Sequence, residues 1–169
     1  EKFSTDLILE EYVEGQLIAY SLFLQDQKVI YGFVGDDKSY LNKYLISTAY
    51  PITLKQVVLD KMRNDVEKIA CRLQLVDGMF HLQIIIKNDI PYIIDVTRRI
   101  PGDLYPKLIE YCDGVAYSKA VVKSYLGEAL EDEFERKSDL NSKQQKFVIR
   151  HCVMAASNGT VKDIKVDHI

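Results

Sequence analysis

Three runs near the start of the chain are rich in apolar, β-branched and aromatic residues, a composition typical of β-strands. The runs cover residues 6–13, 16–24 and 28–34, and a short turn at 14–15 separates the first two. Because strands joined by short turns usually pair with each other, the pattern predicts an antiparallel meander. Residues 35–37 (GDD) are expected to form the turn that follows it.

Residues 53–75 carry the strongest helical pattern in the chain. Thr53 followed by Gln56 fits a capping box, in which side chains satisfy backbone groups at the start of a helix. Apolar residues recur at helical spacing and are expected to form its buried stripe: Val57, Met62, Val66, Ile69, Ala70 and Leu73.

The second half of the chain continues with strands and then shorter helices. Strands are predicted over 81–87 and 91–96. Helices are predicted over 104–112, with Asp103 as the N-cap, and over 115–126. This order, without regular alternation of strand and helix, indicates an α+β fold: an antiparallel β-sheet flanked by helices.

Residues 131–146 are rich in charge and weakly patterned, and are expected to connect two parts of the chain. After them, residues 147–155 and 160–166 flank an Asn-Gly pair and predict a β-hairpin. The predicted organisation is therefore a main domain over 1–130, the charged connector, and a C-terminal hairpin within 147–169.

Composition narrows the classes of function. The 169 residues carry a net charge of −3, which argues against a nucleic-acid surface, because phosphate binding needs a concentrated excess of Lys and Arg. No apolar run approaches the roughly 20 residues that span a bilayer, so no membrane partner is expected. The three cysteines are widely spaced and are interpreted as reduced thiols of a cytoplasmic protein.

Polar residues with chemical potential lie on the two strands after the long helix. Alternate residues of a strand share a face, so His81 accompanies Gln83, and Asp95 accompanies Thr97. An amide oxygen, a carboxylate and a hydroxyl near arginines suit a phosphate-bound Mg²⁺, which prefers hard oxygen ligands. The other interpretation of the same residues is an exposed strand end followed by a charged loop.

Whether these residues meet depends on the turn between the strands. With an odd-length turn over residues 88–90, Gln83 lies opposite Asp95. A tight two-residue turn instead places Gln83 opposite Ile94 and moves Asp95 to the other face. Pro91 has no amide proton for a ladder hydrogen bond, and this favours the odd-length turn.

The segments GMFHLQ at 78–83 and DVTRR at 95–99 resemble the end of an ATP-grasp domain, where an acidic or Gln ligand precedes an E-x-N-x-R sequence. The first segment is similar to the strand of the carbamoyl-phosphate synthase large subunit that offers a Gln to the metal. The resemblance implies that Mg²⁺ or Mn²⁺ is ligated by Gln83, Asp95 and Thr97. It also implies that Arg99, in the family's arginine position, is the catalytic contact to phosphate, with Arg98 a solvated neighbour.

Residues 9–15 (LEEYVEG) resemble the hinge strand that clamps adenine in the same family, and residues 108–130 resemble its closing helices. The resemblance implies that ATP is bound by Glu10, Glu11, Tyr12 and Val13 of the hinge, together with Gln83 and Asp95.

An ATP-grasp enzyme activates a carboxylate as an acyl phosphate and passes it to an amine or similar nucleophile. ATP and small-molecule carboxylate and amine substrates are therefore the implied partners. The family sandwiches ATP between two lobes, and the lobe before the hinge is not in this sequence. We therefore expect a C-terminal lobe, a fragment of a longer ligase that is inactive alone. An exposed sheet edge at its N-terminal end is expected to allow pairing in a homodimer.

Two other hypotheses stay open. Asp95 is one methylene shorter than the family's Glu, and Thr97 replaces its Asn, as in a non-catalytic nucleotide-binding or scaffold domain with a degenerate metal site. An unrelated α+β interaction domain instead predicts that Gln83 and Asp95 lie on opposite faces of the sheet. His81 and the tyrosines Tyr40, Tyr44 and Tyr50 are further candidates for substrate contacts, with core and rim positions as the alternative.

Overall fold

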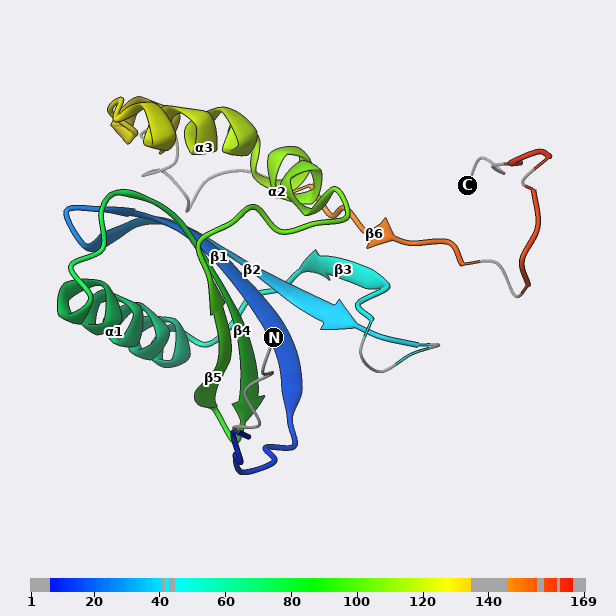
Figure 1. Ribbon diagram of the computed structural model, residues 1–169, viewed down its shortest axis with the longest axis horizontal. Coiled ribbons are helices and arrows are strands. Elements are labelled where there is room, and N and C mark those ends of the chain that lie inside the picture. Colours follow the sequence, from blue (N-terminus) through cyan, green and yellow to red (C-terminus); the bar gives the residue numbers. More distant parts are fainter. Residues whose placement is uncertain are drawn as a thin grey trace, which may run out of the picture.

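The computed structural model describes residues 7–40, 42, 45–134, 146–154, 157–160 and 162–165. Within them, strands form one antiparallel sheet in the order β5-β4-β1-β2-β3-β6. The strands are β1 (Gln16–Gln25), β2 (Lys28–Lys38), β3 (Thr48–Pro51), β4 (Gly78–Lys87), β5 (Ile90–Thr97) and β6 (Arg150–His151). The helices are α1 (Gln56–Arg72), α2 (Tyr105–Asp113), α3 (Tyr117–Leu126) and α4 (Glu131–Phe134). Figure 1 shows α1 on one side of the sheet and α2 and α3 on the other.

The two faces of the sheet are buried against different helices. Ile18 and Leu22 of β1 belong to the core beneath α1, and Ala19 and Phe23 belong to the core beneath α2 and α3. All four are 0% exposed. Successive side chains of a strand point to opposite faces, so a central strand covered on both sides is apolar nearly throughout. This confirms the predicted α+β fold with an antiparallel sheet flanked by helices.

Close contact between β2 and α2 depends on a glycine. A Cβ atom at Gly35 would collide with the hydroxyl oxygen of Tyr105. Because Gly35 has none, the Tyr105 ring lies directly against the strand, edge-on to Phe33 with ring centroids 6.3 Å apart. The start of α2 is thereby fixed over the sheet.

The predicted meander is correct for β1 and β2, which pair antiparallel. The predicted first strand is wrong, because residues 7–14 form no strand, and Leu7, Ile8 and Leu9 are almost fully exposed. The reason lies in the sheet order. Both edges of β1 are occupied, one by β2 and the other by β4, so the segment before β1 has no free edge of that strand to join.

The predicted turn after β2 is also wrong. Asp36 and Asp37 lie inside the strand, only 3% and 6% exposed. Burial of Asp36 is compensated by hydrogen bonds from Gln16 Nε2 (2.9 Å) and the Tyr50 hydroxyl (2.8 Å) and by an ion pair with Lys38. The composition of the segment resembles a turn, but these long-range partners stabilise a strand.

Helix α1 forms as expected, with different details. It begins at Gln56, and the N-cap, Lys55, makes no side-chain cap hydrogen bond, so the capping box at Thr53 is wrong. Val57 and Leu73, two members of the predicted stripe, are 68% and 63% exposed. At about 100° per residue, a stripe displaced by one position faces solvent. The buried residues follow every fourth position: Val58, Met62, Val66 and Ala70.

Helix α2 begins one residue later than predicted, and Asp103 is not its N-cap. The N-cap is Leu104, and both Asp103 and Leu104 have positive φ, 55° and 58°. A capping side chain needs a residue with extended backbone, which neither supplies. The Asp103 carboxylate instead lies 3.8 Å from Arg150.

The C-terminal segment differs most from its prediction. Among residues 146–154, 157–160 and 162–165, the structure forms one two-residue strand, β6, which pairs with β3. The predicted hairpin is therefore absent from this described part, and residues 155, 156, 161 and 166–169 lie outside it. In the predicted connector, Phe134 of α4 stacks on Tyr31, with centroids 4.8 Å apart. The division into domains stays a prediction.

Neither a disulfide nor a membrane-spanning helix is found among the described residues, which include every cysteine. None of the three cysteines is in a disulfide, in agreement with the expected reduced thiols. The described helices are all too short or too polar to cross a membrane.

Candidate functional site

The site begins with the register of β4 and β5. Their turn is the tight one, Asn88-Asp89, with φ of 52° and 61°, so the odd-length loop was wrong. Gln83 nevertheless lies opposite Asp95, as preferred, because the ladder shifts by one residue between Gln83 and Ile84. Ile94 is the extra residue of this β-bulge. A bulge adds a residue to one strand and re-aims the side chains beyond it.

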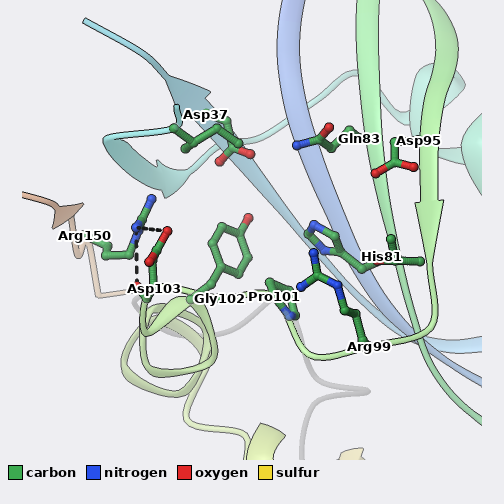
Figure 2. A pocket seen from close by; sticks show the side chains of 12 residues that line it. Asp37, His81, Gln83, Asp95, Arg99, Pro101, Gly102, Asp103 and Arg150 are labelled. Atoms are coloured by element: carbon green, nitrogen blue, oxygen red, sulfur yellow. Dashed lines mark hydrogen bonds and ion pairs between the residues drawn. The ribbon is translucent and has the colours of Figure 1, made fainter. Parts of the chain in front are cut away.

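The bulge brings the predicted ligands onto one wall of a pocket of about 140 Å³. Gln83, Asp95 and Thr97 line it together with His81 and Arg99. Figure 2 shows the side chains of Gln83, Asp95 and His81 along the same side of the pocket. The prediction of an unrelated interaction domain, which required Gln83 and Asp95 on opposite faces, is therefore wrong on this point.

His81 is held in this wall by a hydrogen bond between its Nδ1 and the hydroxyl of buried Ser21, 2.7 Å long. Burial, together with the nearby cation of Arg99, lowers the pKa of His81 to about 4, although the carboxylate of Asp95 opposes the shift. At neutral pH the imidazole is uncharged and offers one donor and one acceptor. Of the predicted substrate contacts, His81 lines the pocket.

The metal-ligand candidates differ in exposure. Asp95 is exposed, and its Oδ1 accepts a hydrogen bond from the amide of Val96 (2.9 Å). Gln83 and Thr97 are half-buried beside it. The described residues contain no group of three or more His, Cys, Asp or Glu placed to hold a metal. This wall therefore offers one carboxylate, one amide oxygen and one hydroxyl, an all-oxygen donor set that fits Mg²⁺ shared with phosphates.

The two arginines after β5 have different surroundings. Arg98 is half-buried and donates to the carbonyl oxygens of Val76 (2.9 Å) and Asp77 (3.1 Å). The prediction that Arg98 is a solvated neighbour is therefore wrong, because these carbonyls anchor it to the segment before β4. Arg99 is exposed and lines the pocket.

The opposite wall of the pocket was missed by sequence reasoning. It contains Asp37 of β2, Asp103 and Arg150 of β6 (Figure 2). Tyr105 of α2 also lines the pocket, and its ring meets the His81 ring edge-on with centroids 5.8 Å apart. Figure 2 shows Asp37 and Arg150 across the pocket from Gln83 and Asp95. The sequence does contain a pair of acidic residues after an apolar strand, but these residues were assigned to a turn and were not considered as site residues. Arg150 carries no local signal.

Asp37 has the most perturbed carboxyl group of the pocket. Burial raises its pKa to about 7; the cation of Arg150 opposes this shift, and the carboxylate of Asp36 adds to it. Burial also raises the pKa of Tyr105 well above its usual value, with Asp37 acting in the same direction.

The predicted adenine hinge lies away from this pocket. Glu10, Glu11 and Tyr12 are exposed, Val13 is half-buried, and none of them is among the lining residues. They belong to the segment that is not a strand, so the structure leaves their role untested.

The predicted tyrosines are not in the pocket either. Tyr50 shares the α1 face with Asp36, to which its hydroxyl donates. Tyr40 stacks on His151 at 5.7 Å between ring centroids. Neither is among the residues that line the pocket. Tyr44 lies outside the described residues.

No family model matches the sequence, and no curated protein matches it. Solved structures do match. The phosphoribosylglycinamide synthetase of Anaerococcus prevotii is similar over 82% of this chain, with a TM-score of 0.70 and 23% identity. The L-amino acid ligase of Bacillus licheniformis is similar over 73%, with a TM-score of 0.61 and 19% identity. The D-alanine–D-alanine ligase of Bacillus anthracis, solved with ATP, is similar over 75%, with a TM-score of 0.53 and 21% identity.

These likenesses show the fold alone, which is part of an ATP-grasp fold. The chain spans 35%, 32% and 42% of the three solved chains, or about a third to two fifths of their length. None of the three is a carbamoyl-phosphate synthase, and the narrower resemblance to that enzyme stays a prediction.

Proposed function

We propose that this chain is part of an ATP- and Mg²⁺-dependent ligase that activates a carboxylate as an acyl phosphate for attack by an amine or similar nucleophile. The observation that carries the proposal is the pairing of Gln83 with Asp95 across the bulge, on one wall of a pocket that Thr97 and Arg99 also line. The likeness in fold to three ligases supports the same class of reaction.

The residues of this wall would have different roles in binding and catalysis. Gln83, Asp95 and Thr97 would hold Mg²⁺ or Mn²⁺ through oxygen atoms, and the ion supplies neutralising charge to the phosphates. Arg99 would donate hydrogen bonds to the transferring phosphoryl group, where its charge lowers the barrier most. His81, neutral at pH 7, would contribute a hydrogen bond without adding a second cation.

Positioning would account for most of the catalysis, because phosphoryl transfer needs alignment and charge stabilisation rather than a covalent group. Glu10, Glu11, Tyr12 and Val13 would contact the adenine and ribose as a hinge. In the described structure this segment is exposed, and it would become ordered against the nucleotide.

The test is a calorimetric titration of Mg·ADP into the chain, and into any longer chain that contains it. Asp95→Ala is compared with wild type, and Glu128→Ala serves as the control because Glu128 is exposed and distant from the pocket. The proposal expects binding that needs the metal and falls at least tenfold in Asp95→Ala alone. Equal affinity in Asp95→Ala and wild type would exclude the metal site from this wall.

One observation favours a second candidate, a nucleotide-binding domain without catalysis. Asp95 is the only acidic residue on its wall of the pocket, and it is exposed. A single short carboxylate holds one metal ion less firmly than a longer, paired set. Metal-dependent nucleotide binding without ADP formation, in a screen of carboxylates and amines, would favour this second candidate.

A further inference from the structure

Three buried polar atoms around the pocket of the metal-ligand candidates have no hydrogen-bond partner in the described part of the chain. They are Asp37 Oδ1, the Tyr105 hydroxyl oxygen and Arg150 Nε. Asp37 and Tyr105 are 6% and 4% exposed, and the Arg150 side chain is 11% exposed. All three residues line the same pocket. Buried polar groups in folded proteins are nearly always paired with protein or with ordered water, so these three need a partner from within the cavity, either water or a ligand.

The neighbouring residue shows that the chain can satisfy a buried acid at this place. Asp36 lies on the opposite face of β2. Its Oδ2 accepts hydrogen bonds from Gln16 and Tyr50, and its Oδ1, which has no hydrogen bond, is compensated by an ion pair with Lys38. Asp37, one residue later, is as deeply buried, and its Oδ1 lacks any such partner. An unpaired buried carboxylate is strongly destabilising, and such groups concentrate at functional sites.

Arg150 does not supply the missing partner, although its charge acts on Asp37 and opposes the burial-driven rise in the pKa of that carboxyl. Its Nη1 donates to the Asp103 carbonyl oxygen (3.3 Å) and to Cys152 Sγ (3.1 Å). The guanidinium is therefore fixed by β6 and the loop before α2. Figure 2 shows its dashed contacts running to Asp103 rather than to Asp37.

The unpaired acceptor atoms in the pocket favour a ligand that is a positively charged hydrogen-bond donor. Asp37 Oδ1 accepts hydrogen bonds, and the Tyr105 hydroxyl can accept one as well. A primary ammonium group brings three N–H donors and the positive charge that a buried carboxylate requires. An anion would be repelled by Asp37 but attracted by Arg150, whose Nε is an unpaired donor that an ammonium cannot satisfy. The choice of an ammonium therefore rests on the two unpaired acceptors, Asp37 Oδ1 and the Tyr105 hydroxyl oxygen. The volume of about 140 Å³ exceeds several times the roughly 30 Å³ of one water, so a small amine fits.

We propose that Asp37 anchors a subsite for the primary ammonium group of the amine substrate, with the Tyr105 hydroxyl as a second contact. The proposal rests on the proposed function, because it assigns the nucleophile's place in the same pocket. Asp37 lies across the cavity from Gln83 and Asp95 (Figure 2). The ammonium would release a proton to the Asp37 carboxylate, and the resulting amine, facing the wall at which the carboxylate is activated, would attack the acyl phosphate, form the C–N bond and displace phosphate.

The experiment is an NMR titration of the chain with ethylammonium chloride at pH 8.5, without nucleotide or metal. Propionamide and sodium acetate serve as neutral and anionic probes. The expected result is saturable shift changes at Asp37, Tyr105 and their neighbours with ethylammonium only. Asp37→Asn should weaken this binding at least tenfold and Tyr105→Phe about threefold. The matched control, Asp103→Asn, removes the same charge from an exposed position of the pocket and should weaken binding less than threefold.

The proposal is overturned by equal ethylammonium binding in Asp37→Asn and wild type, by saturable binding of acetate at the same residues, or by no saturable binding at all. Tyr105→Phe and Asp103→Asn decide the matter if Asp37→Asn does not fold, because Tyr105→Phe should then weaken binding more than Asp103→Asn does. Asp95→Ala separates the two walls. Loss of ethylammonium binding in Asp95→Ala would place the cation at Asp95 and refute the Asp37 subsite. The Mg·ADP titration tests the proposed function separately.

Discussion

Replacing Asp37 by asparagine should stabilise the protein above pH 7 and leave its stability at pH 4 unchanged. Asparagine has the shape of the protonated acid and carries no charge. The pKa of Asp37 is about 7 in the folded chain, against an ordinary value of 3.8, chiefly because the side chain is buried. The folded state therefore keeps its proton over a pH range in which the unfolded state has already released it.

The sign and size of the effect follow from linkage. Between about pH 4 and pH 7 the folded state binds more protons at Asp37 than the unfolded state, so this residue's contribution to stability falls as the pH rises. A pKa higher by about three, at 1.36 kcal/mol for each pKa unit, corresponds to a loss of about 4 kcal/mol by pH 8. Asp37→Asn removes that loss, and the difference between variant and wild type should grow from zero to about this value.

Urea unfolding followed by far-UV circular dichroism measures the difference at pH 4, 6 and 8, since the chain contains no tryptophan. The comparison between proteins is needed because His81, whose pKa is lowered to about 4, gives wild type an opposing pH dependence. Glu128→Gln, at an exposed position, should parallel wild type. Equal pH profiles for Asp37→Asn and wild type would refute the reasoning, because the carboxyl group would then titrate as an exposed one does.

Three further outcomes are expected. Gly35→Ala should lower the free energy of unfolding in urea by about 1–3 kcal/mol, because the new methyl group collides with the Tyr105 hydroxyl. Adding Tyr105→Phe should recover part of this loss, whereas full stability of Gly35→Ala would contradict the contact. Arg98→Ala should lower the free energy of unfolding by about 1–3 kcal/mol, because Arg98 donates to two carbonyl oxygens. Arg98→Lys should restore little of this loss, because one ammonium cannot reproduce the planar guanidinium that reaches both oxygens. Full stability of Arg98→Lys would argue against this geometry. Wild type should lose stability as the pH falls from about 6.5 to 4, relative to His81→Gln, since the folded imidazole resists protonation, and coincident acid profiles would show that it does not.

The sequence predicted what local pattern controls and missed what distant partners control. The fold class, β1 and the body of α1 follow from periodicity and from the properties of neighbouring residues. The pairing of Gln83 with Asp95 was predicted from an odd-length loop that is wrong, and it arises from the bulge instead. The bulge at Ile94 could not be predicted, because nothing local marks it. Asp37 was assigned to a turn because acidic residues after a glycine usually lie in turns, whereas its strand is determined by pairing with β1 and β3.

The distribution of polar residues on β4 explains why the site lies where it does. On the face toward α1, Phe80, Leu82 and Ile84 are buried along the whole strand. On the other face only Met79 is buried beneath α3, and His81 and Gln83 follow, half-buried, where the helical cover ends. An uncovered sheet face that needed only solubility would carry exposed charges. These residues instead line a pocket that Asp37 lines from the opposite side. Unpaired polar groups are costly and concentrate at functional sites, so their position around one pocket supports the proposed amine subsite.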